Sequence, residues 1–152
     1  MTVTAKAFSK FSYSLGNKEV DLNSDTIKCA LFTNAHAPDQ DTDQYYDGAH
    51  EMTEVAEDAT PNGYSTGGAA VGSPTLTQST PSYEIFMFDG SNPSWEVTAG
   101  GFTYRYAVFY DDTPGSNKPL ISYVDFGEDI VAVEGTHTIV LDEDGIATIT
   151  AS

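Results

Sequence analysis

The stretch FTYRYAVFYDDTPGSNKPLISYVDF, residues 102–126, carries the clearest structural pattern in the chain. It predicts two β-strands, 102–110 and 119–126, because apolar residues continue on both sides of a turn at 111–117 that holds Pro-Gly and Ser-Asn. Successive side chains of a strand point to opposite faces, and both faces of the first strand are largely apolar. Such a strand belongs in a sheet that is covered on both sides, as in a β-sandwich. We therefore predict that this hairpin is the centre of an all-β domain.

Further strands are predicted on either side of the hairpin. Alternating apolar residues indicate strands over 26–33, 50–55, 83–88 and 95–98. A second hairpin, 137–141 with 146–150, is predicted around Asp142–Gly145, a loop whose glycine suits the left-handed conformation and which sets Leu141 opposite Ile146. About seven to nine short strands predict an antiparallel β-sandwich with jelly-roll or immunoglobulin-like connections. No linker divides the sequence, so residues 1–152 are expected to form a single domain.

The remaining segments are less regular. Residues 4–16 fit a strand or a helix, and we favour a short helix because Phe8, Phe11 and Leu15 share a helical face. Residues 34–48 are rich in aspartate and lack a strand pattern, which is typical of a functional loop. Residues 73–82 hold Ser, Thr and two prolines and are predicted to be an exposed edge or loop.

The charge of the chain limits its partners. It carries 23 acidic residues against 6 basic ones, a formal net charge of -17. Binding to nucleic acid depends on clustered Lys and Arg, so we expect no nucleic-acid partner. The same charge repels anionic membranes.

The cysteine content limits the covalent and metal chemistry of the chain, and its N-terminus predicts synthesis in the cytoplasm. Cys29 is the single cysteine, so the chain can form neither an internal disulfide nor a cysteine-based zinc site, and we expect Cys29 to be a buried apolar residue. Lys6 and Lys10 interrupt the apolar residues near the N-terminus, which does not fit a secretion signal. No stretch approaches the roughly 20 apolar residues of a membrane helix, so we expect no membrane partner.

Asp39, Asp41 and Asp43 form the pattern D-x-D-x-D, with which many calcium loops begin. The match then fails, because an EF-hand would need glycine at Gln44 and a bidentate acid at His50. A Ca²⁺ site at the three aspartates and a solvated acidic loop both remain open. No other cofactor is predicted.

Catalysis has little support in the sequence. No histidine stands beside a serine or cysteine in a recognisable nucleophile motif. The acidic pairs and triplets at Asp111–Asp112 and Asp142–Asp144 are interpreted as turn residues on a soluble surface. We predict that the protein is not an enzyme, with a glycan-cleaving carboxylate pair as the alternative.

Aromatic residues are the other candidates for function. Tyr45, Tyr46, Tyr64 and Trp95 lie in predicted loops or near glycines, where a ring could stack on a sugar or anchor an interface. Aromatic residues of a sandwich are more often core, and for Trp95 we favour the core or a subunit interface. The predicted interface residues are Phe8, Phe11, Tyr64 and Trp95.

Several blocks of the sequence resemble a group of small virion proteins of tailed bacteriophages. Their order and spacing, more than any one block, carry the resemblance: LGNKEVDL (15–22), DTIKCAL (25–31), GYSTGG (63–68), YRYAVFYDD (104–112) and PLI (119–121). The resemblance implies a structural protein of the virion and brings no catalytic residues. Small β-sandwich proteins of this kind often decorate or cement the capsid.

We therefore expect a phage capsid decoration or cement protein. Its partner would be the major capsid protein, it would act as a homo-oligomer, and it would lie on the outer surface of the virion capsid after synthesis in the host cytoplasm. The alternative is a tail or fibre module that binds cell-surface carbohydrate. Hundreds of copies per particle would favour the first function, and measurable affinity for a glycan the second.

Overall fold

The computed structural model describes residues 2–47, 51–58, 62–80 and 85–150. The start of each predicted strand at 50–55 and 83–88 therefore lies outside the described residues. Among the described helices, none has the length and apolar character needed to cross a membrane.

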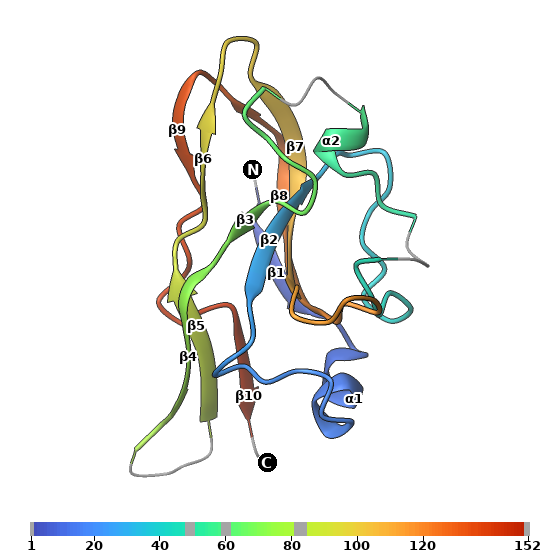
Figure 1. Cartoon of the computed structure of the whole chain (residues 1–152), viewed down its shortest axis with the longest axis vertical. Helices are drawn as coiled ribbons and strands as arrows, with labels where there is room; N and C mark the ends of the chain where they lie inside the picture. The colour runs from blue at the N-terminus through green and yellow to red at the C-terminus, as the bar shows by residue number, and fades with distance from the viewer. Residues whose placement is uncertain (1, 48–50, 59–61, 81–84, 151–152) are drawn as a thin grey trace.

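The predicted hairpin lies inside a five-stranded antiparallel sheet (Figure 1). Its strands are, in spatial order, β1 (Thr4–Ala7), β8 (Leu120–Ala132), β7 (Phe102–Asp111), β2 (Ile27–Phe32) and β3 (Ala69–Ala70). β7 and β8 pair with Ala107 opposite Val124, and β2 pairs with the other edge of β7. Most side chains of β7 are buried on both of its faces, which confirms the sequence argument for a doubly covered strand.

Two smaller sheets cover one face of the five-stranded sheet (Figure 1). One contains β10 (Ala147–Thr150), β5 (Ile85–Ser91) and β4 (Gly72–Gln78), and the other pairs β6 (Ser94–Val97) with β9 (Gly135–Thr138). β4 is the exposed edge strand that the composition of 73–82 indicated. The opposite face is covered by loops and by the short helices α1 (Phe11–Gly16) and α2 (Val55–Asp58) (Figure 1). The predicted all-β antiparallel sandwich with a short N-terminal helix is confirmed, although a strand, β1, precedes the helix.

The predicted C-terminal hairpin is wrong. Residue His137 pairs with Trp95 in the sheet of β6 and β9, whereas Thr148 pairs with Met87 in the sheet of β5 and β10. The turn itself exists, since the N–H of Gly145 donates to the carbonyl of Asp142 and Gly145 has φ +77°. The chain uses this turn to cross from one small sheet to the other. Alternating side chains show that a segment is extended, but they do not identify the strand with which it pairs.

The buried carboxylate of Glu54 holds in place the loops that lie on the side of the central sheet opposite the two small sheets. Glu54 is 3% exposed and makes a β-bridge to Phe32. Its Oε1 accepts hydrogen bonds from the hydroxyl of Tyr64 (2.6 Å) and the N–H of Gly67 (2.7 Å), and its Oε2 accepts one from the hydroxyl of Tyr46 (2.6 Å). The Tyr64 hydroxyl also accepts the N–H of Leu31, at 2.8 Å, beside the edge of β2. Irregular backbone needs partners of this kind, because it has no ladder to satisfy its polar groups.

Candidate interaction groove

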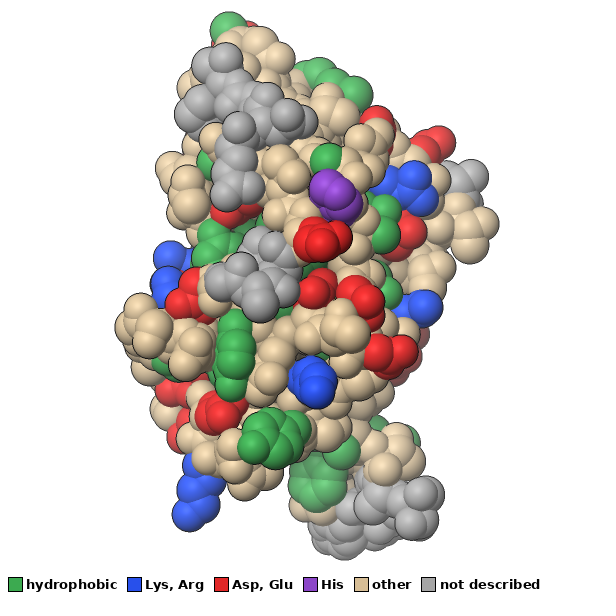
Figure 2. Space-filling view, turned by 90° about the vertical axis from the view of Figure 1, so that its right-hand side faces the viewer, with side chains coloured by type: hydrophobic (Ala, Val, Ile, Leu, Met, Phe, Trp, Pro, Cys, Tyr) green, Lys and Arg blue, Asp and Glu red, His purple; other side chains and the backbone are tan. Residues whose placement is uncertain are grey.

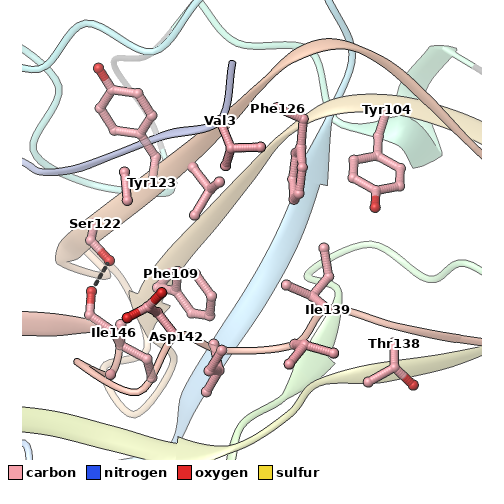
Figure 3. Close-up of a pocket in the computed structure, with 15 residues that line it drawn as sticks. Val3, Tyr104, Phe109, Ser122, Tyr123, Phe126, Thr138, Ile139, Asp142 and Ile146 are labelled. Atoms are coloured by element: carbon pink, nitrogen blue, oxygen red, sulfur yellow. Dashed lines mark hydrogen bonds between the residues drawn. The ribbon is translucent and has the colours of Figure 1, made fainter. Parts of the chain in front are cut away.

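A groove opens on the face of the central sheet that the two small sheets cover. It lies between the β1 edge and the segment that leads from β9 to β10 (Figure 3). Its volume is about 670 Å³. Val3 and Phe126 border it from the central sheet and Ile139 from the crossing segment, while Phe109 lies at its base (Figure 3). The wall is mainly apolar, and a largely apolar concave surface with a few polar groups is the usual form of a binding site.

A hydrogen bond joins the two layers at one end of the groove. The hydroxyl of Ser122 on β8 donates to the carbonyl of Ile146, at 2.9 Å, and joins the layers at one end (Figure 3). Nearby apolar side chains stay in contact with solvent, since Val3 is 53% and Val140 is 76% exposed. An exposed apolar patch around a groove marks a surface suited to a partner.

Two strand edges border this side of the molecule. β1 pairs with β8 and β10 pairs with β5, and each is the outermost strand of its sheet. A second hollow of about 350 Å³ lies between them, lined by Ala5 and Ala7 on β1 and by Ile146 and Thr148 at β10. An outermost strand presents unpaired N–H and C=O groups, to which another extended chain can bind.

The hydrogen-bond pattern of β1 identifies the free groups. The N–H of Phe8 donates to the carbonyl of Ile121, at 3.0 Å. In an antiparallel ladder, alternate residues bond the neighbouring strand. Lys6 therefore faces β8 with its main-chain groups, whereas Ala5 and Ala7 direct theirs away from β8. The carbonyl of Ala7 accepts the side-chain amide of Gln40 at 3.1 Å, so the N–H and C=O of Ala5 are the groups that this edge offers to a further strand.

The rim of the groove is acidic at one end. Asp142 lines both hollows, and Asp144 lines the smaller one. Glu143, at the tip of the same turn, is exposed. Lys6 lines the smaller hollow as well. A ligand with a positive charge near this turn would gain favourable electrostatic interactions.

A neutral polar pair lies beside the groove, which Tyr104 lines and His137 does not. The hydroxyl of Tyr104 on β7 and Nε2 of His137 on β9 lie 2.8 Å apart. Burial lowers the pKa of His137 and raises the pKa of Tyr104, so both side chains are uncharged at neutral pH. The thiol of Cys29 is fully buried and its pKa is raised for the same reason, which leaves it unreactive.

The three aspartates of the predicted calcium loop support the loop itself. Asp39 accepts the N–H groups of Asp41 (2.9 Å) and Thr42 (3.1 Å), which lowers its pKa, and Asp43 accepts the N–H of Asp39 at 2.8 Å. Asp41 accepts the hydroxyl of Ser9 at 2.7 Å. The described residues include no group of three or more His, Cys, Asp or Glu side chains arranged to hold a metal ion. The Ca²⁺ site stays a prediction.

The loop that holds these three aspartates forms a polar surface on the loop-covered face of the central sheet. A hollow of about 340 Å³ is lined by His36, Asp39, Asp43 and Glu51. Figure 2 shows acidic side chains (red) gathered over the middle of this face, with basic side chains (Lys or Arg, blue) spaced among them. The surface therefore differs sharply from the apolar groove on the other side.

The four predicted interface residues require a correction. Phe8, Phe11, Tyr64 and Trp95 are all between 1% and 5% exposed and belong to the core. Phe8 packs on Tyr123 and Tyr64 stacks on Trp95, with ring centroids 5.1 and 6.3 Å apart. Their rings are used inside the chain and are not available to a partner.

The acidic pair at the hairpin turn also differs from its interpretation as a solvated turn. Asp112 forms ion pairs with Lys28 (2.8 Å) and Lys118 (2.7 Å). Asp111 is fully buried; its Oδ1 accepts the N–H of Thr113, at 2.9 Å, and its carboxyl group also contacts that of Asp25. Burial and this contact raise the pKa of Asp111 to about 7. The two acids can hydrogen-bond to each other only by sharing a proton.

Sequence reasoning missed the groove and the buried Glu54. The sequence pattern predicts that Val140 lies in a paired strand. Val140 is exposed because the chain crosses from one small sheet to the other at this point, and the alternation of side chains does not reveal such a crossing. Glu54 carried no signal, because an acid among apolar residues is ordinarily a surface residue. No protein family, curated protein or solved structure matches this chain.

Proposed function

We propose that this protein is a structural component of a tailed-phage virion, a capsid decoration or cement protein that binds the major capsid protein as a homo-oligomer. The observation that carries the proposal is the apolar groove bordered by two outermost strands, because it offers a surface for a protein partner. The resemblance of the sequence blocks to small virion proteins points in the same direction.

The charge distribution fits a role on a particle surface. A net charge of -17 disfavours adhesion to the packaged DNA and between particles. Weak contacts repeated over a capsid lattice would retain the protein strongly, because each further contact is made at a high effective concentration.

The alternative of a carbohydrate-binding tail module has less support. Two of its four candidate stacking residues, Tyr64 and Trp95, are buried in the core. A sugar would therefore depend on the half-buried Tyr45 and Tyr46 or on another ring, such as Tyr13, which is 61% exposed.

Cryo-electron microscopy of purified particles of the phage that encodes this protein tests the proposal. We expect density for the fold at repeated positions on the outer capsid surface. Its absence from the capsid, or its presence in a few copies at the tail, would contradict the proposal. Glycan-array binding by the isolated chain would in that case favour the alternative.

A further inference from the structure

The open side of the sandwich has the geometry of a site for one additional strand. β1 and β10 end their sheets on the same side of the molecule, and the two hollows lie between them. Ala5 directs its main-chain N–H and C=O into this space. An extended segment could therefore pair with β1 through main-chain hydrogen bonds, about 4.8 Å away, as in other cases of strand addition.

The groove also determines which types of side chain such a segment would carry at alternate positions. A strand alternates its side chains between two faces, so every second residue would point toward the groove. The groove wall presents Val124, Phe126 and Ile139, which favour apolar groups such as Val, Ile or Leu at those positions. The intervening side chains would face away from the groove and are less restricted.

Charge argues for a partner protein over a second copy of this chain. Asp142 and Asp144 stand at one end of the open side, beside the exposed Glu143. A second copy, with its own net charge of -17, would be disfavoured beside this acidic turn, so contacts within a homo-oligomer are expected on other surfaces, whereas Lys or Arg in a partner would be attracted to this turn. The attraction should weaken as salt concentration rises.

We infer that the groove binds an extended segment of a capsid-shell protein as an added strand along β1, with apolar residues at alternate positions and a Lys or Arg beside the Asp142–Asp144 turn. This inference rests on the proposed function, since it names the partner as a shell protein. It specifies the mode of binding, which the proposed function leaves open.

The test uses particles from which this protein has been deleted, with purified full-length chain added back. The first pair of variants is Val140→Asp and Val131→Asp. Both valines are strongly exposed, at 76% and 65%, but Val140 lines the groove and Val131 does not. We expect Val140→Asp to weaken binding about tenfold or more and Val131→Asp to change it less than about twofold.

The second pair of variants tests the acidic turn, and its two members have the same net charge as each other. Asp144→Lys and Glu134→Lys change the charge equally, and both residues are exposed, but Asp144 lines the open side. We expect Asp144→Lys to weaken binding severalfold at low salt and Glu134→Lys to have a smaller effect. Equal effects of the two substitutions would show that overall charge, and not this turn, attracts the partner.

Hydrogen exchange distinguishes strand addition from simple apolar contact. On binding, the amide of Ala5 should gain protection, because it would donate to the added strand. Thermal unfolding of each free variant checks that its fold is intact.

The outcomes separate the two proposals. If the unaltered chain fails to bind the particles, the proposed function fails. If it binds, but Val140→Asp binds equally well or Ala5 gains no protection, the inference of strand addition is wrong and the proposed function stands. Density for a second copy of this chain in the groove would also overturn the inference.

Discussion

The two sides of the central sheet are covered in opposite ways. On one side, irregular loops are held by buried hydrogen bonds to Glu54 and by the stacked rings of Tyr46 and Tyr110, whose centroids lie 4.1 Å apart. On the other side, short regular strands form the cover and leave a groove of about 670 Å³. The loops need internal polar partners because they have no ladder, whereas the strands satisfy their own groups except at the edges. We call the loop-covered side, whose hollow of about 340 Å³ is polar, the closed side, and the strand-covered side, with its apolar groove, the open side.

The largest change in stability is expected when the hydrogen bonds that hold the loops of the closed side are removed. Glu54→Ala removes a buried acceptor of hydrogen bonds from the hydroxyls of Tyr46 and Tyr64 and from the N–H of Gly67. We expect a loss of about 3–5 kcal/mol in the free energy of unfolding, measured by urea denaturation. Glu143→Ala, at an exposed loop tip, is the control and should change stability by less than about 0.5 kcal/mol. Similar losses for the two variants would show that the closed side does not depend on Glu54.

A pH series gives the next largest effect. Asp111 has its pKa raised from 3.8 to about 7 by burial and by Asp25. Between these values the folded state binds one proton more than the unfolded state, so the free energy of unfolding should fall as pH rises, by up to about 1.4 kcal/mol per pH unit. Asp111→Asn, which cannot ionise, should remove this slope and be more stable than the unaltered chain above pH 7. An unchanged slope in this variant would contradict the assignment.

On the open side, the contribution of His137 to the free energy of unfolding changes with pH in the opposite direction. The lowered pKa of His137 means that the folded state binds a proton less readily there, so its contribution is present above the ordinary pKa of 6.5 and is lost as pH falls through the folded value. His137→Gln should reduce this part of the profile. Proton NMR titration of the His137 ring measures the same quantity directly, and an ordinary or raised pKa would refute the prediction.

A smaller effect is expected where the two layers meet. Ser122→Ala removes the hydrogen bond to the carbonyl of Ile146 and should cost about 1 kcal/mol. Ser116→Ala, at an exposed turn, should be neutral. Thermal denaturation of both variants compares them, and equal midpoints would mean that this bond does not hold the layers together.

The smallest effect is expected inside the open groove. Val140→Ser should change the free energy of unfolding by less than about 0.5 kcal/mol, because Val140 is already 76% exposed. Val108→Ser is the matched substitution on the closed side, where the valine is fully buried, and should cost more than about 2 kcal/mol. Comparable losses from the two substitutions would remove the distinction between the two sides.

The sequence predicted what depends on local pattern and missed what depends on pairing. The hairpin of β7 and β8 followed from apolar residues on both faces and a strong turn. The separation of β9 from β10 did not, because the same alternation fits either partner. The groove is a product of that separation, so its exposed Val140 was out of reach of pattern analysis. Phe8, Phe11 and Tyr64 were predicted at an interface, and Trp95 at an interface or in the core, because the sequence does not tell an aromatic core residue from an interface residue. All four are core residues.

The position of β1 affects how the protein is made. Its four residues pair with residues 122–125, so β1 leaves the ribosome well before the strand with which it pairs has been translated. Contacts between such distant parts of a chain form slowly. During synthesis the nascent β1, Thr4–Ala7, would therefore remain without its neighbouring strand until β8 has been made.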